Sequence, residues 1–253
     1  MRGKLIVIEG TDCSGKETQT NLLMKILENN DIPVTKFSFP NYESPTGKII
    51  GGPYLGKNYI SSSWFKEGAV NVDAKVASLY YAADRKYNLK EISKALDYGI
   101  NVVLDRYSYS NMAHQGGKLE TKEERNSLYT WIEKLEFELL ELPKADIRVF
   151  LHMPYEGAVI LKEGRSSDGL DSHEKDETYL KRAEQAYFEI ADRFDFYTIE
   201  CMENGRIKRI DEIQEELSSY VLEQIKSIDY IIEIKGDIVK PLFLFLLIFT
   251  LRF

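Results

Sequence analysis

Residues 4–20, KLIVIEGTDCSGKETQT, carry two glycines and a lysine at a spacing that could bind phosphate. Gly10, Gly15 and Lys16 fit the pattern Gly-x-x-x-x-Gly-Lys, in which backbone N–H groups and an ammonium surround phosphate oxygens. An apolar run precedes this loop and a helical pattern follows it, so the positive end of a helix would face the same phosphates. We therefore expect a phosphate-binding segment made of Gly10, Thr11, Asp12, Cys13, Ser14, Gly15, Lys16, Glu17 and Thr18.

The residue after the lysine departs from the usual pattern. Glu17 stands where a Ser or Thr hydroxyl commonly binds Mg²⁺. Glu17 could bind the ion itself, act through water, or face outward while the metal is held elsewhere. Thr18 supplies a hydroxyl, but a helix turns it by about 100° from the position of Glu17. The residues leave these alternatives open.

Charged residues in three other segments could also act on phosphate. Asp105 ends the apolar run INVVLD, as do acidic residues that hold Mg²⁺ in kinases and hydrolases, and Arg106 could bind a second phosphate with two hydrogen bonds. Tyr81 and Arg85, four residues apart, would share a helix face that suits a base. Arg165 lies in a polar loop with two glycines, which suits a lid. Taken singly, Asp105 and Arg106 fit an ion pair at a strand end, Tyr81 fits core packing, and Arg165 fits a solvated charge.

The segments that position these residues alternate between strand and helix. Five apolar runs of strand length are typical of a buried parallel sheet: 4–9, 34–39, 100–107, 146–153 and 196–201. Helical patterns begin at Gly15 and near Ser172, and also cover 74–96, 122–140 and 209–225. We predict an α/β fold with helices on both faces of the sheet, and a loop-rich segment over 41–63. The loops after the first three strands would then meet at one edge.

Composition excludes several classes of protein. The chain has 253 residues and a net charge of −8, which suits one globular domain and argues against an electrostatic nucleic-acid binder. Its two cysteines, Cys13 and Cys201, form neither a disulfide framework nor a Cys-x-x-Cys metal pattern. Residues 241–253 are strongly apolar, but they are fewer than the roughly 20 that a membrane-spanning helix needs.

The order of these motifs resembles the thymidylate kinase family. EGTDCSGKETQ, FPNY, LYYAADR, DRYSYSNMAHQG, the Arg165 loop and NGRIKRIDEI follow one another as they do in that family, over about residues 3–225. The resemblance implies a P-loop nucleoside monophosphate kinase fold, with a five-stranded parallel sheet and a lid at about 164–172. The kinase-like domain would span 1–228, and 229–253 would be an apolar tail of unknown role.

The resemblance also implies an activity and a setting. The chain would make dTDP from dTMP and ATP with Mg²⁺, as a cytoplasmic homodimer without nucleic-acid or membrane partners. Lys16, Asp105, Arg106 and Arg165 would be catalytic, and Asp105 and Glu17 would bind the metal. Arg206 and Ile207 would flank the adenine of ATP. The residues expected to bind dTMP are Asp12, Phe39, Pro40, Tyr81, Arg85, Arg106, His114 and Gln115.

Position by position, the resemblance also separates two family types. Cys13 stands where some members carry a catalytic arginine, so Arg165 points to the type with the arginine on the lid. His114 stands where Tyr or Phe is usual. Three other functions remain open: a kinase for another nucleoside monophosphate or a nucleoside, a nucleotide-hydrolysing switch, and a non-catalytic nucleotide-binding module. The segment PKAD at 143–146 lacks the Asn of guanine-specific switches and precedes a strand, which disfavours the switch.

Overall fold

The computed structural model describes residues 2–163 and 177–228. Arg165, the predicted lid and the apolar segment 241–253 therefore lie outside the described residues. The chain forms two compact units, residues 1–217 and 218–253, whose boundary lies within a helix over residues 210–228. The candidate site described below belongs to the first unit.

Five parallel strands form the central sheet of the first unit, as predicted. They are β1 (Leu5–Gly10), β2 (Val34–Ser38), β3 (Asn101–Asp105), β4 (Ile147–His152) and β5 (Tyr197–Glu200). Their order is β2-β3-β1-β4-β5, and every pairing is parallel. All six residues of β1 are buried, which explains its continuous apolar sequence. Because β1 is central, the loop after it lies between those that follow β3 and β4.

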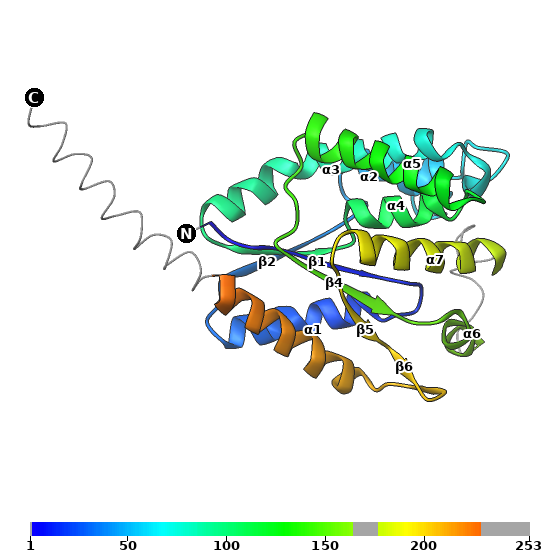
Figure 1. Cartoon of the computed structure of the whole chain (residues 1–253). Coiled ribbons are helices and arrows are strands. Elements are labelled where there is room, and N and C mark those ends of the chain that lie inside the picture. The colour runs from blue at the N-terminus through cyan, green and yellow to red at the C-terminus, as the bar shows by residue number, and fades with distance from the viewer. Residues whose placement is uncertain (1, 164–176, 229–253) are drawn as a thin grey trace, which may run out of the picture. The chain divides into compact units, whose positions relative to one another are not determined.

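Helices cover both faces of this sheet (Figure 1). α1 (Lys16–Asn29) lies on one face, and α3 (Ala74–Asp97), α4 (Ser108–Gly116), α5 (Lys122–Glu133) and α7 (Glu177–Arg193) lie on the other. α6 (Tyr155–Glu163) follows β4. Within the described residues, none of the helices combines the length and the apolar character needed to cross a membrane.

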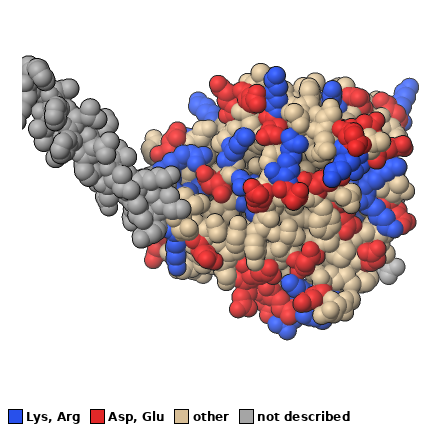
Figure 2. Space-filling model, in the orientation of Figure 1, with Lys and Arg blue, Asp and Glu red and all other residues tan. Residues whose placement is uncertain are grey.

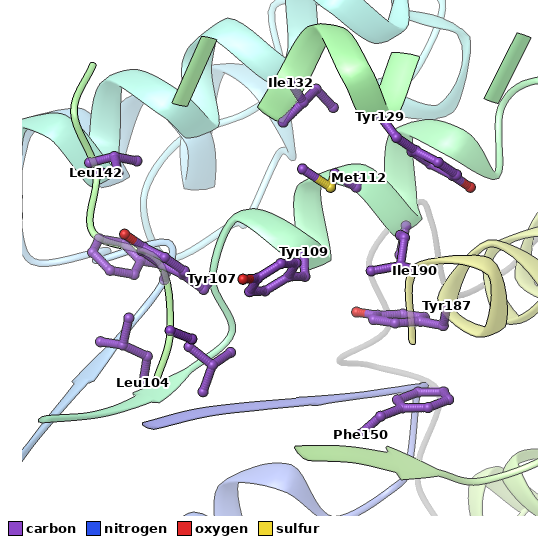
Figure 3. Close-up of a cluster of buried hydrophobic side chains, with 14 of the residues drawn as sticks. Leu104, Tyr107, Tyr109, Met112, Tyr129, Ile132, Leu142, Phe150, Tyr187 and Ile190 are labelled. Carbon is purple, nitrogen blue, oxygen red and sulfur yellow. The ribbon is translucent and has the colours of Figure 1, made fainter. Parts of the chain in front are cut away.

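Aromatic side chains fill the core between the sheet and the second helical layer (Figure 3). Phe150 of β4 stacks on Tyr187 of α7, with ring centroids 5.2 Å apart and an interplanar angle of 12°. Tyr109 of α4 packs edge-on against Phe196, at 4.9 Å. Aromatic pairs in these arrangements stabilise a core beyond the area they bury. The core therefore fixes α4 and α7, which both carry side chains of the site.

The prediction of a loop-rich segment over 41–63 is wrong for its central part. Residues Pro45–Ile49 form α2, and the π-helical turn Ile50–Tyr54 continues it. The Ser44 hydroxyl accepts a hydrogen bond from the Gly47 N–H, and Pro45 stands in the first turn, where its missing N–H costs nothing. A short antiparallel hairpin, β6 (Met202–Glu203) and β7 (Arg206–Ile207), is a further element that periodicity does not reveal.

Candidate active site

The loop after β1 turns sharply and requires glycine at two positions. A Cβ atom added at Gly10 would lie 2.7 Å from the Leu151 carbonyl oxygen. Gly15 has a φ of 76°, in the left-handed region that glycine adopts without strain. Cys13, with a φ of 59°, adopts the same region without that freedom. The loop therefore has the sharp backbone turn that was predicted for phosphate binding.

Thr11 fastens this loop to the end of β4. Its hydroxyl donates to the Met153 carbonyl oxygen at 2.7 Å and accepts from the Met153 N–H at 2.8 Å. On the other side, the Cys201 thiol, just after β5, lies 3.8 Å from the Ser14 carbonyl oxygen. The ends of three neighbouring strands thus hold the loop in place.

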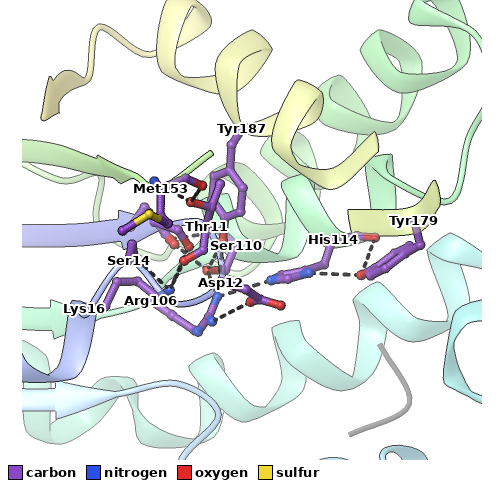
Figure 4. Close-up of polar contacts among 12 residues, drawn as sticks. Thr11, Asp12, Ser14, Lys16, Arg106, Ser110, His114, Met153, Tyr179 and Tyr187 are labelled. Atoms are coloured by element: carbon purple, nitrogen blue, oxygen red, sulfur yellow. Dashed lines mark hydrogen bonds and ion pairs between the residues drawn. The ribbon is translucent and has the colours of Figure 1, made fainter. Parts of the chain in front are cut away.

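Lys16 is buried and places its ammonium inside the loop (Figure 4). Nζ donates to the carbonyl oxygens of Gly10 at 2.8 Å and Thr11 at 2.9 Å. Burial, together with the nearby charge of Arg106, lowers the pKa of Lys16 to about 8. The loop carbonyls thus hold the cation at the position where phosphate oxygens are expected to compete for it.

Arg106 directly follows β3 and directs its guanidinium toward α4 and α7. Its φ of 68° is uncommon for a residue other than glycine, and such strain clusters at functional sites. Nη1 lies 3.3 Å from both Ser110 Oγ and Tyr187 Oη, and 3.2 Å from His114 Nε2. His114 Nδ1 in turn lies 3.0 Å from Tyr179 Oη. A fork held from several sides can bind a phosphate with defined geometry.

Asp12 lies between cations at the tip of the loop. Its carboxylate oxygens are 3.9 Å from Arg106 Nη2 and 3.9 Å from Lys162 Nζ. Burial raises the pKa of Asp12, but the positive charges of His114 and Arg106 outweigh it and hold that pKa below its usual range. The loop after β1 and the loop after β3 therefore meet through charge, as predicted from the strand ends.

A cavity of about 250 Å³ lies beside these charges. All eight residues expected to bind the monophosphate line it: Asp12, Phe39, Pro40, Tyr81, Arg85, Arg106, His114 and Gln115. Tyr81 and Arg85 contribute from one face of α3, as their spacing predicts. Six other lining residues were not predicted from the sequence: Tyr42, Leu55, Lys57, Tyr107, Ser110 and Asn111. Three of these belong to the motif DRYSYSNMAHQG, so the motif pointed to them without showing which faced inward.

Arg85 is held by a partner that the sequence analysis did not identify. Its Nε and Nη2 donate to the two carboxylate oxygens of Glu136, each at 2.6 Å. Burial lowers the pKa of Arg85, but the Glu136 charge outweighs it, so that pKa is raised. Glu136 lies in the π-helical turn Lys134–Leu139 that continues α5, four residues after the buried Ile132. A charged residue on an otherwise apolar helix face was the feature of the sequence that could have indicated a buried partner at Glu136.

Glu9 is a second buried carboxylate that sequence reasoning missed. It accepts hydrogen bonds from the N–H groups of Tyr107 at 2.8 Å and Ser110 at 3.0 Å, and from the Ser110 hydroxyl. Burial raises the pKa of Glu9. The residue thus fixes the first turn of α4, which positions Arg106 and the cavity wall.

The two predicted metal ligands occupy different environments. Asp105 is partly buried at the end of β3, and its charge acts on Lys16. Glu17 is exposed in the first turn of α1, and Thr18 is exposed beside it. Within the described part of the chain, no three His, Cys, Asp or Glu side chains gather as a metal-binding group. Mg²⁺ commonly keeps waters and substrate phosphates and takes only one or two carboxylates, so a site for it would not require such a group.

Arg206 and Ile207 form strand β7 of the hairpin. The Arg206 side chain is exposed and forms two hydrogen bonds with Glu212, at 2.9 and 3.1 Å. The segment after the hairpin returns to α1, because Gln19 Nε2 donates to the Ile210 carbonyl oxygen at 2.9 Å. This contact places the chain after the hairpin beside the helix that begins at the phosphate-binding loop.

Comparison with known proteins gives one consistent result. Residues 8–211 match the family model described as thymidylate kinase. A thymidylate kinase of Plasmodium falciparum is 34% identical over 180 residues, which cover 71% of this chain and 74% of that protein. The thymidylate kinase of Dictyostelium discoideum is 30% identical over 90% of this chain and 88% of its own.

A solved structure extends the similarity to three dimensions. The thymidylate kinase of Candida albicans, described as having broad substrate specificity, matches with a TM-score of 0.67 at 25% identity. The match covers 89% of this chain and 93% of the other.

Proposed function

The chain belongs to the thymidylate kinase family, and from this premise we propose that it transfers the γ-phosphoryl group of ATP to dTMP, giving dTDP and ADP. One observation carries the proposal. The cavity that contains Tyr81, Arg85 and Arg106 borders the phosphate-binding loop at Asp12. A nucleotide in the cavity would thus present its phosphate toward phosphates held by the loop.

ATP would bind through the loop and the hairpin. The backbone N–H groups of residues 10–18 and the Lys16 ammonium would surround the β- and γ-phosphates. Arg206 and Ile207 would flank the adenine. The exposed position of the hairpin supports this assignment, because its side chains are accessible to a ligand.

dTMP would bind in the cavity of about 250 Å³. Tyr81 would stack on the base, Arg85 would bind its edge, and Phe39 and Pro40 would form a wall. Arg106 would bind the phosphate, and His114 and Gln115 would lie near the sugar and base. Support comes from Gln115, which is fully buried with neither amide atom hydrogen-bonded to a described residue. A buried amide of this kind calls for a partner that the described side chains do not supply, such as ordered water or a ligand.

Transfer requires two anions to be brought into line while their charge is neutralised. Lys16 would act on the donor phosphates and Arg106 on the acceptor phosphate. Arg165 would act on the transferring group from the lid, and lid closure would exclude water that otherwise hydrolyses ATP. The buried carboxylate of Glu9 keeps the start of α4 fixed, so the Arg106 fork would need little reorganisation.

We propose Mg²⁺ as the metal, with Asp105 and Glu17 as its protein ligands. When bound, the ion would neutralise charge on the donor phosphates. Asp105 suits this role because it ends β3 near Lys16 and offers the carboxylate oxygens that Mg²⁺ prefers. Glu17 is exposed, which supports a ligand acting through water over a direct one.

The assembly and location are proposed on the same family resemblance. We propose a homodimer, supported by exposed apolar side chains on α3. We propose a cytoplasmic location and no nucleic-acid partner. Figure 2 shows Lys and Arg mixed with Asp and Glu on the visible face, and the net charge is −8, neither of which favours binding to a polyanion.

The test is ADP formation from ATP and Mg²⁺ with dTMP, run beside dUMP, dCMP, dAMP and no acceptor. We expect the highest rate with dTMP and almost none without an acceptor. A higher rate with another monophosphate would change the assigned substrate. ADP release without any acceptor would indicate a hydrolase, and ATP binding without ADP would indicate a non-catalytic module.

A further inference from the structure

His114 stands where the family usually has Tyr or Phe, so it brings to the cavity two ring nitrogens that those residues lack. Both nitrogens have partners (Figure 4). Nε2 lies 3.2 Å from Arg106 Nη1, and Nδ1 lies 3.0 Å from the Tyr179 hydroxyl on α7. What each nitrogen does depends on which of them carries the proton, and the partners determine this.

The partners of His114 allow only one neutral form of its ring. Arginine only donates hydrogen bonds, so Nε2 must accept from Arg106 Nη1 and carries no proton. The Tyr179 hydroxyl donates its one hydrogen to the His114 carbonyl oxygen, at 3.2 Å, so its oxygen must accept from Nδ1. Two independent contacts thus assign the same tautomer, with the proton on Nδ1 and a lone pair on Nε2.

The Nε2 lone pair directs one edge of the Arg106 guanidinium. The other acceptors near Nη1 are the hydroxyls of Ser110 and Tyr187, each at 3.3 Å, and a hydroxyl oxygen accepts from a wide range of directions. An imidazole nitrogen accepts only along its single lone pair, which lies in the plane of the ring. His114 is therefore the acceptor that restricts the guanidinium most.

The other edge of the guanidinium is left for a ligand. Within residues 2–163 and 177–228, Arg106 Nε and Nη2 form no hydrogen bond, and Nη2 lies 3.9 Å from Asp12 Oδ1. The Arg106 side chain lines the cavity and is 27% exposed, so a ligand can reach it. Nε and Nη2 together form the edge that can bind two oxygens of one phosphate. Holding Nη1 therefore presents this edge in a defined direction.

Only the neutral ring of His114 can align Arg106 in this way. A proton on Nε2 would remove the acceptor and place a second cation beside the guanidinium. The charged ring acts on Asp12 instead: burial raises the pKa of Asp12, and the charged form of His114 lowers it. The neutral and the charged forms of His114 therefore serve different partners.

We infer that His114 is a positioning residue, which aligns Arg106 for the phosphate of the acceptor nucleotide by accepting a hydrogen bond at Nε2. The inference rests on the proposed function for the identity of that ligand. Tyr179 acts one step further away, because its hydroxyl keeps the proton on Nδ1 and so keeps the lone pair on Nε2. The phosphate, rather than the sugar or the base, is the part of the nucleotide whose binding depends on this chain of hydrogen bonds.

The tautomer is tested by nitrogen NMR of the full chain with isotope-labelled histidine and without any nucleotide. The pH is set well above the ordinary histidine pKa of about 6.5. We expect Nε2 of His114 to give the signal of an unprotonated ring nitrogen and Nδ1 to give that of an N–H. His114→Gln identifies these signals, because its spectrum lacks them. A proton on Nε2 under these conditions would overturn the inference.

The consequence for binding is tested by calorimetry with dTMP and with thymidine, which has the same base and sugar but no phosphate. His114→Phe keeps a ring near the sugar but removes the acceptor. We expect it to weaken dTMP binding at least about 5-fold, since a hydrogen bond to a charged group is lost, and to leave thymidine binding unchanged. His114→Gln supplies an acceptor that does not titrate and should restore most of the preference for dTMP.

Equal losses for dTMP and thymidine in His114→Phe would assign the residue to the sugar and base or to folding, and would overturn the inference. An unchanged preference for dTMP would overturn it as well. Tyr179→Phe keeps the His114 ring and should lower the same preference, because the proton can then move to Nε2. If His114→Phe does not fold, the tautomer and Tyr179→Phe still decide. Binding of dTMP with these effects but without phosphoryl transfer would refute the kinase function alone.

Discussion

At the scale of single residues, the site depends on charges that are buried before any substrate is added. Lys16 is the clearest case, because burial and Arg106 lower its pKa to about 8. Below that pH the ammonium is charged and can attract phosphate, whereas above it the amine is neutral. We therefore expect kcat/KM for ATP, which reports the free enzyme, to fall as pH rises through about 8. Bound phosphates favour the charged form, so the fall in kcat should occur at higher pH.

The control for this profile is a second buried lysine. Burial also lowers the pKa of Lys118 to about 8, and its ammonium donates to the carbonyl oxygens of Ala69 and Val72. Lys118→Arg keeps a charge that does not titrate in this range, so its kcat/KM profile should match that of the unmutated chain. If the transition disappears in Lys118→Arg, it belongs to Lys118 and not to Lys16. A kcat/KM profile that stays flat up to pH 10 would also contradict the role given to Lys16.

The residues that sequence analysis identified are those that carry a local pattern. Lys16 follows two spaced glycines, and Asp105 and Arg106 end an apolar run. Glu136 belongs to no such pattern, and it meets Asn111 only when α4 packs against the turn after α5. Their pairing is a tertiary contact, so no spacing along the chain encodes it.

At the scale of elements, the glycines and prolines of residues 41–63 are the reason that a loop was predicted where α2 and a π-helical turn form. These residues usually interrupt helices, but here they allow close packing. A Cβ atom added at Gly47 would lie 1.8 Å from the Asn41 carbonyl oxygen. The buried Asp84 of α3 then fixes the segment, accepting from the Asn41 N–H at 2.8 Å, the Ser44 hydroxyl at 2.9 Å and the Thr46 hydroxyl at 2.7 Å. Hydrophobic periodicity cannot reveal that this segment is helical, because the hydrogen bonds that fix it come from another element, α3.

Asp84→Ala should loosen the whole segment that contributes Tyr42, Leu55 and Lys57 to the cavity. The variant leaves several donors without their acceptor, so we expect it to lower the free energy of unfolding by about 2–4 kcal/mol. It should also raise KM for dTMP more than KM for ATP. Urea unfolding and steady-state kinetics would measure both effects. Asp97→Ala, at the exposed end of α3, is the control and should change stability by less than about 0.5 kcal/mol. Equal effects of the two substitutions would refute this account.

At the scale of the whole molecule, alternation of strands and helices predicts the parallel sheet but not the order of its strands. Any permutation of five buried runs has the same hydrophobic pattern. The observed order places β3 and β4 on either side of β1, so the loops after β1 and β3 meet at a switch point where ligands bind in such sheets. The convergence of motifs was therefore predictable, while the neighbours of each strand were not.

The prediction at this scale concerns the proposed homodimer and the face of α3 that would form its interface. Val76, Leu79 and Tyr87 lie on the outer face of α3 and are 42%, 49% and 59% exposed. A face of this kind favours association, because burying it removes apolar surface from water. Light scattering should give twice the chain mass of 29.2 kDa, and Leu79→Glu should shift the protein toward the mass of one chain. The substitution would place a carboxylate without a partner in the interface, and burying such a charge makes association unfavourable.

Two controls assign the association to α3. Ile210→Glu changes another apolar side chain, 57% exposed, and should leave the mass unchanged. A chain that ends at residue 240 lacks the apolar segment 241–253, so a dimer that persists in it does not depend on that segment. If Leu79→Glu keeps the doubled mass across a dilution series while the shortened chain loses it, association belongs to the C-terminal segment. The exposed face of α3 would then not be the dimer interface.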